Sequence, residues 1–135
     1  MITAIDTNIL IDVFADDKTY AESSLKVLRE AEQAGQLIVC EIILAETARY
    51  FESLEMLRET FDSIGIMREP VGEAACYLAG QRFLEYRRKG GKRDRVLADF
   101  LIGAHALVRC GKLVTRDRGF YRTYFSDLTI VDPSV

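Results

Sequence analysis

The chain has 135 residues, of which 49% are hydrophobic and 29% charged, and its formal net charge at pH 7 is −3. The composition excludes a disordered chain and a collagen-like repeat, and the length predicts a single domain over residues 1–135. Apolar runs are interrupted by charges well before the ~18 residues that a membrane span needs, and the first residues lack the basic stretch of a signal peptide. We therefore expect a soluble, cytoplasmic protein that makes no membrane contact.

Short apolar runs that predict strands alternate along the chain with segments of helical periodicity. Strands are predicted at residues 2–5, 37–40, 66–67, 113–115 and 128–131. Helices are predicted at residues 20–34, at about 43–63 as two helices broken near Ser53, at 71–88 and at 96–110. This alternation favours an α/β fold with a mainly parallel sheet of four to five strands.

The cysteine and histidine content limits the kind of metal site that the chain can build. Cys40, Cys76 and Cys110 are odd in number and far apart, which disfavours a disulfide framework or a zinc knuckle. His105 is the single histidine, and we expect it to be a helix residue without a catalytic role. A metal ion would therefore be held mainly by oxygen, which suits Mg²⁺ or Mn²⁺.

Four acidic residues occupy positions where an ordinary surface charge is not expected. Asp6 and Asp117 each follow a predicted strand, and ligands bind at the carboxyl ends of parallel strands. Asp99 lies in a helix that is apolar on both sides, which predicts a central, buried helix. Glu46 is likewise set among the apolar residues of the segment 42–48.

Carboxylates that meet in an apolar setting repel one another unless a cation neutralises them, and a hard divalent cation with oxygen ligands is the usual solution. Other interpretations remain open for individual acids. In the alternative interpretations, Asp99 caps or pairs locally, and Asp117 forms a surface ion pair with Arg116 or Arg118. The remaining acids considered are interpreted as helix-end and loop charges: Asp12, Asp16, Asp17 and Asp94.

Four segments in this order resemble the PIN domain family, and most closely its VapC-type toxins from toxin–antitoxin pairs. They are IDTNILID at residues 5–12, Glu46, DFLIGAHA at residues 99–106 and LVTRDRGF at residues 113–120. The resemblance covers essentially the whole chain. It differs at Gly103, where many relatives have alanine.

The resemblance implies a three-layer α/β/α sandwich and a metal-dependent ribonuclease that hydrolyses RNA phosphodiester bonds. It implies that Asp6, Asp99 and Asp117 bind Mg²⁺ or Mn²⁺ and that Glu46 completes the acidic catalytic cluster. Thr7, Asn8 and Thr115 would then support these carboxylates by hydrogen bonds. The expected partners are an antitoxin protein that covers the site and a second copy of the chain in a homodimer.

Six of the 18 basic residues lie within nine positions, and they suggest a route for RNA. These candidates for RNA phosphate binding are Arg87, Arg88, Lys89, Lys92, Arg93 and Arg95, with Arg116 as a further one. Alternatively the run is a solvated helix end, and Arg116 pairs with an acid. The aromatic residues between 120 and 125 either stack on bases or pack a short helix onto the sheet.

Other functions are compatible with parts of this pattern. The alternatives are a catalytically silent PIN-fold binding module and an RNA-processing nuclease without an antitoxin. A haloacid dehalogenase-type phosphatase would carry a second carboxylate where Asn8 stands, and a receiver domain would carry a lysine near Thr115. Both of these classes are therefore disfavoured.

Overall fold

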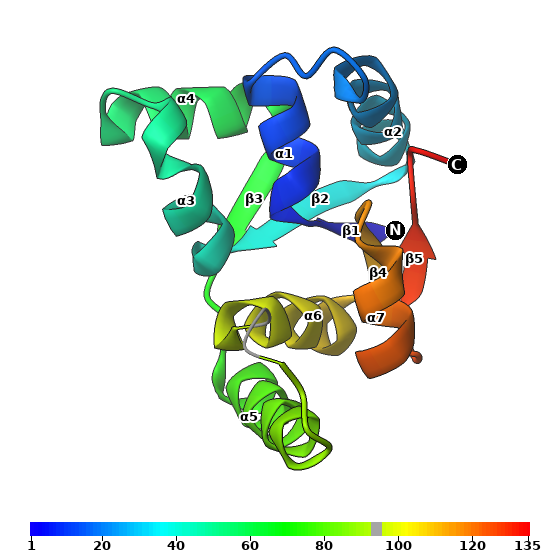
Figure 1. Cartoon of the computed structure of the whole chain (residues 1–135). Coiled ribbons are helices and arrows are strands. Elements are labelled where there is room, and N and C mark those ends of the chain that lie inside the picture. Colours follow the sequence, from blue (N-terminus) through cyan, green and yellow to red (C-terminus); the bar gives the residue numbers. More distant parts are fainter. Residues whose placement is uncertain (93–95) are drawn as a thin grey trace.

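The computed structural model describes residues 1–92 and 96–135, and a single sheet lies at its centre (Figure 1). Within these residues the sheet has five strands in the order β3-β2-β1-β4-β5, and every neighbouring pair is parallel. The strands are β1 (Ile2–Ile5), β2 (Gln36–Cys40), β3 (Ile66–Glu69), β4 (Lys112–Val114) and β5 (Thr129–Val131). The mainly parallel sheet predicted from the sequence is confirmed.

Helices cover both faces of this sheet, which confirms the three-layer arrangement (Figure 1). The first helices are α1 (Thr7–Phe14), α2 (Ala21–Ala34), α3 (Glu41–Thr47) and α4 (Leu54–Ile64), with a 3₁₀ turn at Ala48–Tyr50 after α3. The later ones are α5 (Glu73–Arg88), α6 (Leu97–Arg109) and α7 (Arg118–Tyr124). Helices α1 and α2 lie on one face and α6 on the other, with α5 packed outside α6 (Figure 1). In the part of the chain described here, no helix is both long enough and apolar enough to cross a membrane.

The sequence pattern does not predict α1, although it begins directly after β1. Its apolar residues run continuously from Ile9 to Ile11, because the helix is packed closely against the rest of the molecule and lacks a wide polar face. Asp6 marks its start, since the Asp6 carboxylate accepts a hydrogen bond from the Thr7 amide as an N-cap. The N-cap therefore places a carboxylate at the end of β1.

One part of the core lies where α6 and α7 pack on the sheet, as expected for a central buried helix. Phe100 of α6 is fully buried and contacts the rings of Phe120 and Phe125. Gly103 allows this packing, because a Cβ at that position would lie 2.6 Å from the Phe125 ring. The aromatic residues at 120 and 125 thus pack a short helix onto the sheet, as the second interpretation of this segment predicted.

The sheet order determines which loops meet. Strand β1 pairs with β4 in parallel, with Ile5 opposite Val114. The residues that follow the two strands, Asp6 and Thr115, therefore lie at the same edge of the sheet. The N-termini of α1 and α7 begin at this edge as well.

Candidate active site

Asp6 is the most enclosed carboxylate of the candidate site. Its side chain is held at both oxygens: the Thr7 amide donates to Oδ1 at 2.7 Å, and the Thr115 hydroxyl donates to Oδ2 at 2.7 Å. The Asn8 amide group adds a longer hydrogen bond to Oδ2 at 3.3 Å. With only 6% of the residue exposed, these contacts leave the carboxylate one orientation.

Burial is the strongest influence on the pKa of the Asp6 carboxyl. Burial raises the pKa of Asp6 to about 6, although hydrogen bonds from Thr115, Thr7 and Tyr121 lower the pKa and so oppose the shift. The negative charge of Glu46 raises the pKa further. A carboxylate that is oriented by hydrogen bonds but costly to ionise is one that a nearby cation would stabilise.

Thr115 and Asn8 connect Asp6 to the loop after β4. The Thr115 hydroxyl, besides donating to Asp6, accepts hydrogen bonds from the Asn8 side chain at 3.1 Å and from the Asp117 amide at 3.0 Å. The side-chain oxygen of Asn8, Oδ1, accepts a hydrogen bond from the Arg116 backbone amide at 3.1 Å. The structure therefore brings together the supporting residues that the resemblance implied.

Glu46 reaches the cluster from α3, in a setting different from the one expected. The expectation of an apolar environment is wrong, because Glu46 is exposed, whereas its neighbours Ile43 and Thr47 are buried. A helix that packs one side against the protein leaves its other side in solvent, and Glu46 lies on that side. The Thr7 hydroxyl donates to Glu46 Oε1 at 2.6 Å and so holds its carboxylate beside Asp6.

Asp99 and Asp117 are both half-buried and both stand at helix N-termini. Asp99 lies in the first turn of α6 and accepts the Val96 amide at 3.3 Å, whereas Asp117 precedes α7 as its N-cap residue. Burial raises the pKa of the Tyr121 hydroxyl well above its usual value, and the charges of Asp6, Asp99 and Asp117 raise it further. These carboxylates therefore all lie near the Tyr121 hydroxyl.

Tyr121 is a residue of the site that sequence reasoning missed. The sequence suggests base stacking or packing for this residue, whereas in the structure its buried hydroxyl lies close enough to the Asp6 carboxylate to lower the pKa of Asp6. Its spacing from Asp117 was an available signal, because residues four apart on a helix share a face.

The site offers carboxylate oxygens to the divalent cation that the sequence suggested. Among the described residues, no three acidic, histidine or cysteine side chains are close enough together to enclose an ion on their own. Mg²⁺ does not require such an enclosure, since it keeps several waters and is usually bound through one or two carboxylates. The carboxylate oxygens of the site and the raised pKa of the buried Asp6 therefore fit Mg²⁺ or Mn²⁺.

Asp12 is not the loop or helix-end charge that the sequence suggested. It is 2% exposed within α1, and its carboxylate is bound by the Arg116 guanidinium through two hydrogen bonds of 2.8 Å. The interpretation was wrong because the cation that pairs with Asp12 comes from a distant loop. Arg116 also lies over the Tyr20 ring, 3.9 Å from its centroid, so the structure favours pairing over RNA contact for Arg116.

The basic run lies at the end of α5 and after it. Arg87 and Arg88 are exposed on the last turn of α5, and Lys89 and Lys92 are exposed in the residues that follow. The two other candidates for RNA binding in this run, Arg93 and Arg95, lie outside the described residues, as does Asp94.

Comparison with known proteins identifies related sequences and folds. The family model described as PIN domain matches residues 3–126. The solved structure of VapBC2 from Rickettsia felis, bound to a DNA fragment from their promoter, is 21% identical with a TM-score of 0.74, and 98% of each chain is covered. VapBC-1 from nontypeable Haemophilus influenzae is 20% identical with a TM-score of 0.74 over 100% of both chains. FitAcB from Neisseria gonorrhoeae is 19% identical with a TM-score of 0.63 over 98% of both chains. No curated protein matches the chain.

Proposed function

Because this chain belongs to the PIN domain family, we propose that it is a metal-dependent ribonuclease that hydrolyses RNA phosphodiester bonds. The observation that carries the proposal is the setting of Asp6. Its carboxylate is buried, is held by hydrogen bonds from three neighbouring residues and has a raised pKa, at the edge where Asp99, Asp117 and Glu46 also lie.

In this proposal Asp6 and Asp99 are the principal ligands of Mg²⁺ or Mn²⁺, and Asp117 completes the acidic cluster beside them. The bound ion would lower the pKa of a water molecule and stabilise the charge that develops on the phosphoryl group. Thr115 and Asn8 keep the Asp6 oxygens in place, so the carboxylate does not need to reorganise during the reaction.

Glu46 differs from the other acids because it faces solvent, and we assign it a different role. Its carboxylate, anchored by the Thr7 hydroxyl at 2.6 Å, accepts the proton that the attacking water loses. Solvent exposure lets Glu46 release that proton again after each turnover.

The likeness to the VapBC structures supports a place in a toxin–antitoxin pair. We propose in addition that the antitoxin covers the carboxylates and that the toxin is a cytoplasmic homodimer. The surface near Tyr50, Phe51, Leu54 and Leu57 is a candidate groove for the antitoxin. Leu57 is buried and Phe51 packs on Phe14, so core packing accounts for these two, whereas Leu54 remains exposed. We propose that the antitoxin contacts Leu54.

The proposal is tested by incubating a mixed RNA pool with the purified chain and Mg²⁺, Mn²⁺ or EDTA. Asp99→Asn keeps the shape of the side chain and removes its charge. The control is Asp62→Asn, which makes the same change at an exposed position of α4. We expect cleavage by the wild type and by Asp62→Asn with either metal, and at least a hundredfold slower cleavage by Asp99→Asn. Equal cleavage by all three proteins, or cleavage that persists in EDTA, would refute the proposal. A folded wild type that binds RNA without cutting it would favour the silent binding module.

A further inference from the structure

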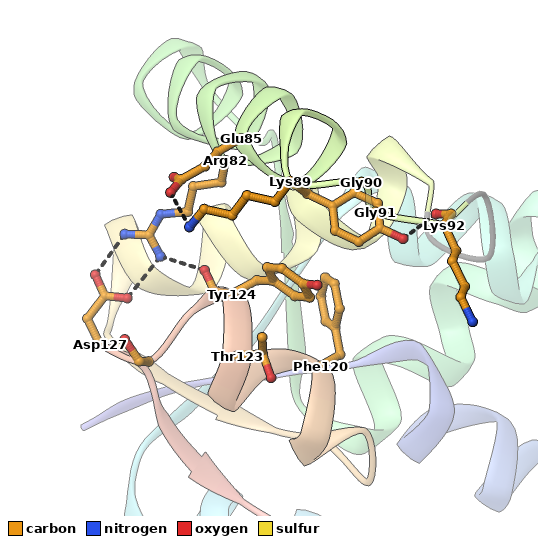
Figure 2. Close-up of a pocket in the computed structure, with 12 residues that line it drawn as sticks. Arg82, Glu85, Lys89, Gly90, Gly91, Lys92, Phe120, Thr123, Tyr124 and Asp127 are labelled. Carbon is orange, nitrogen blue, oxygen red and sulfur yellow. Dashed lines mark hydrogen bonds and ion pairs between the residues drawn. The ribbon is translucent and has the colours of Figure 1, made fainter.

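A hollow with a volume of about 860 Å³ opens between the end of α5, residues 90–92 and α7 (Figure 2). We propose that it binds one nucleotide of a single-stranded RNA, next to the phosphodiester bond that is cut. This inference rests on the proposed nuclease function and adds a subsite that determines specificity.

Helix α7 and Phe100 connect the wall of the hollow to the segments that carry Asp117 and Asp99. Phe120 and Tyr124 line it from α7, the helix that begins after Asp117. Both rings pack on Phe100, with centroids 5.2 and 5.9 Å away, and Phe100 directly follows Asp99. An RNA strand whose phosphate lies over the carboxylates therefore reaches the hollow with its adjoining nucleotide.

Cations on the rim of the hollow are available to RNA phosphates. Lys89 forms an ion pair with Glu85 at 2.9 Å, but the two side chains are 73% and 63% exposed. An ion pair this exposed is worth little, so Lys89 can exchange Glu85 for a phosphate at small cost. Lys92 is exposed too, and Figure 2 shows the two lysine side chains leaving the rim in different directions. In this proposal each lysine contacts a different phosphate of the strand.

Arg82 contributes structure rather than a phosphate site. Its guanidinium forms two hydrogen bonds of 2.9 Å with Asp127 and one of 3.1 Å with the Tyr124 carbonyl oxygen (Figure 2). These contacts tie α5 to the end of α7 and hold the far wall of the hollow in place.

Tyr124 supplies a surface for a base. Its half-buried ring meets Tyr86 edge-to-face, with centroids 5.1 Å apart and planes at 87°. Tyr86 is itself fixed, because its hydroxyl donates to the Lys92 carbonyl oxygen and a Cβ at Gly91 would collide with the Tyr86 backbone. A ring fixed in this way loses little entropy when a base stacks on it.

The size and lining of the hollow favour a nucleotide over an acidic protein segment. Its volume lies within the roughly 300–1,000 Å³ of typical ligand pockets. A carboxylate-rich peptide would use the lysines but would add no stacking partner to the half-buried Tyr124 ring. A nucleotide uses both, through its phosphate and its base.

The test measures RNA binding without cleavage, in the Asp99→Asn chain with EDTA, by the fluorescence anisotropy of a labelled short oligouridylate. Lys89→Ala/Lys92→Ala removes the phosphate contacts and Tyr124→Leu removes the aromatic face while keeping bulk. Lys26→Ala is the matched control, because Lys26 forms the same exposed pair, with Glu30, on α2. We expect about tenfold weaker binding for Tyr124→Leu and for the double lysine variant. For the double variant, the slope of the logarithm of the binding constant against the logarithm of the salt concentration should be smaller in magnitude by about 1.4, because each phosphate contact on a single strand contributes about 0.7.

Thr123→Glu gives a second test that does not depend on the aromatic packing, because Thr123 is exposed on α7 and its substitution adds a negative charge to the hollow. It should weaken binding at least tenfold with an unchanged melting temperature. Binding equal to that of Lys26→Ala in all these variants would overturn the subsite but leave the nuclease intact, provided that the wild type cuts RNA. Competition by polyglutamate as effective as that by RNA would also overturn it, in favour of an acidic protein partner. A wild type that neither binds nor cuts RNA would refute the proposed function as well.

Discussion

Arg116 and Asp12, which are 104 residues apart, form a bidentate ion pair with two hydrogen bonds of 2.8 Å. Ser24 of α2 donates a third hydrogen bond to Asp12 at 2.8 Å. The pair connects the loop after β4 to α1 and α2, and the Arg116 amide binds Asn8 next to the carboxylate cluster. The ion pair therefore stabilises the same contact between α1 and the β4 loop that orients Asp6.

Removal of Arg116 should be costly because it leaves a buried charge behind. Arg116→Ala is expected to lower the free energy of unfolding by about 2–4 kcal/mol, somewhat less than for a fully buried pair because the Arg116 side chain is 25% exposed. Arg118→Ala is the control, since Arg118 lies 3.5 Å from Asp132 and is more exposed, and it should cost less than about 1 kcal/mol. Urea unfolding at pH 7 compares the two, and equal losses would contradict a structural role specific to Arg116.

Thr115→Val tests whether the hydroxyl that orients Asp6 supports metal binding. The substitution keeps the shape but removes the hydrogen bond to Asp6 and the acceptor for the Asp117 amide. We expect 10–100-fold weaker binding of Mn²⁺, in the range found for residues that orient metal ligands. Thr47→Val removes an equally buried hydroxyl whose partner is the Ile43 carbonyl of its own helix, and it should leave Mn²⁺ binding unchanged. Calorimetric titration with Mn²⁺ measures both, and equal affinities in the two variants would argue against this role.

Gly103→Ala should destabilise the fold although alanine is the better helix former. The added methyl group would lie 2.6 Å from the buried Phe125 ring, and such overpacking typically costs 1–3 kcal/mol, so we expect a loss of about 2 kcal/mol. Gly80→Ala is the opposite case, because Gly80 is exposed on α5 with nothing within 4 Å of the added Cβ. It should stabilise the protein by about 0.5–1 kcal/mol. Thermal unfolding of both variants is the measurement, and a stabilising Gly103→Ala would contradict the packing described here.

Glu69 should contribute stability that acid removes. Burial raises the pKa of Glu69, but hydrogen bonds from Arg109 and His105 outweigh burial and hold the pKa below its usual 4.5. Because the pKa is lower in the folded state, this contribution is fully present above about pH 4.5 and is lost as the pH falls through the folded pKa. Glu69→Gln should therefore cost about 1–2 kcal/mol at pH 7 and show a shallower loss of stability in acid than the wild type.

Glu85→Gln is the control for this effect. The pKa of Glu85 is also lowered, through its hydrogen bond with Lys89, but the pair is exposed and screened by solvent. Urea unfolding between pH 3 and 7 should therefore give nearly the wild-type curve for Glu85→Gln. A Glu69→Gln curve parallel to that of the wild type would show that Glu69 is not linked to acid unfolding.

Local patterns in the sequence predict the order of strands and helices and most of the acidic residues of the candidate site. Strands and helices differ in hydrophobic period, and this period is a local property of the chain. Asp6 and Asp117 follow predicted strands, and Asp99 interrupts a helix that is otherwise apolar, so each acid stands out against its neighbours. The same local signal failed for α1, whose apolar residues run continuously through Ile9–Ile11.

Which of these residues come into contact depends on how distant segments of the chain pack together. The order β3-β2-β1-β4-β5 places β1 beside β4, and this pairing brings Asp12 to Arg116 and Thr115 to Asp6. Strand order is set by the packing of the whole core, and no local pattern in the chain records it. For the same reason, local patterns do not predict the exposure of Glu46, the position of Tyr121 near the carboxylates or the hollow between α5 and α7. Each of these features depends on the packing of distant segments.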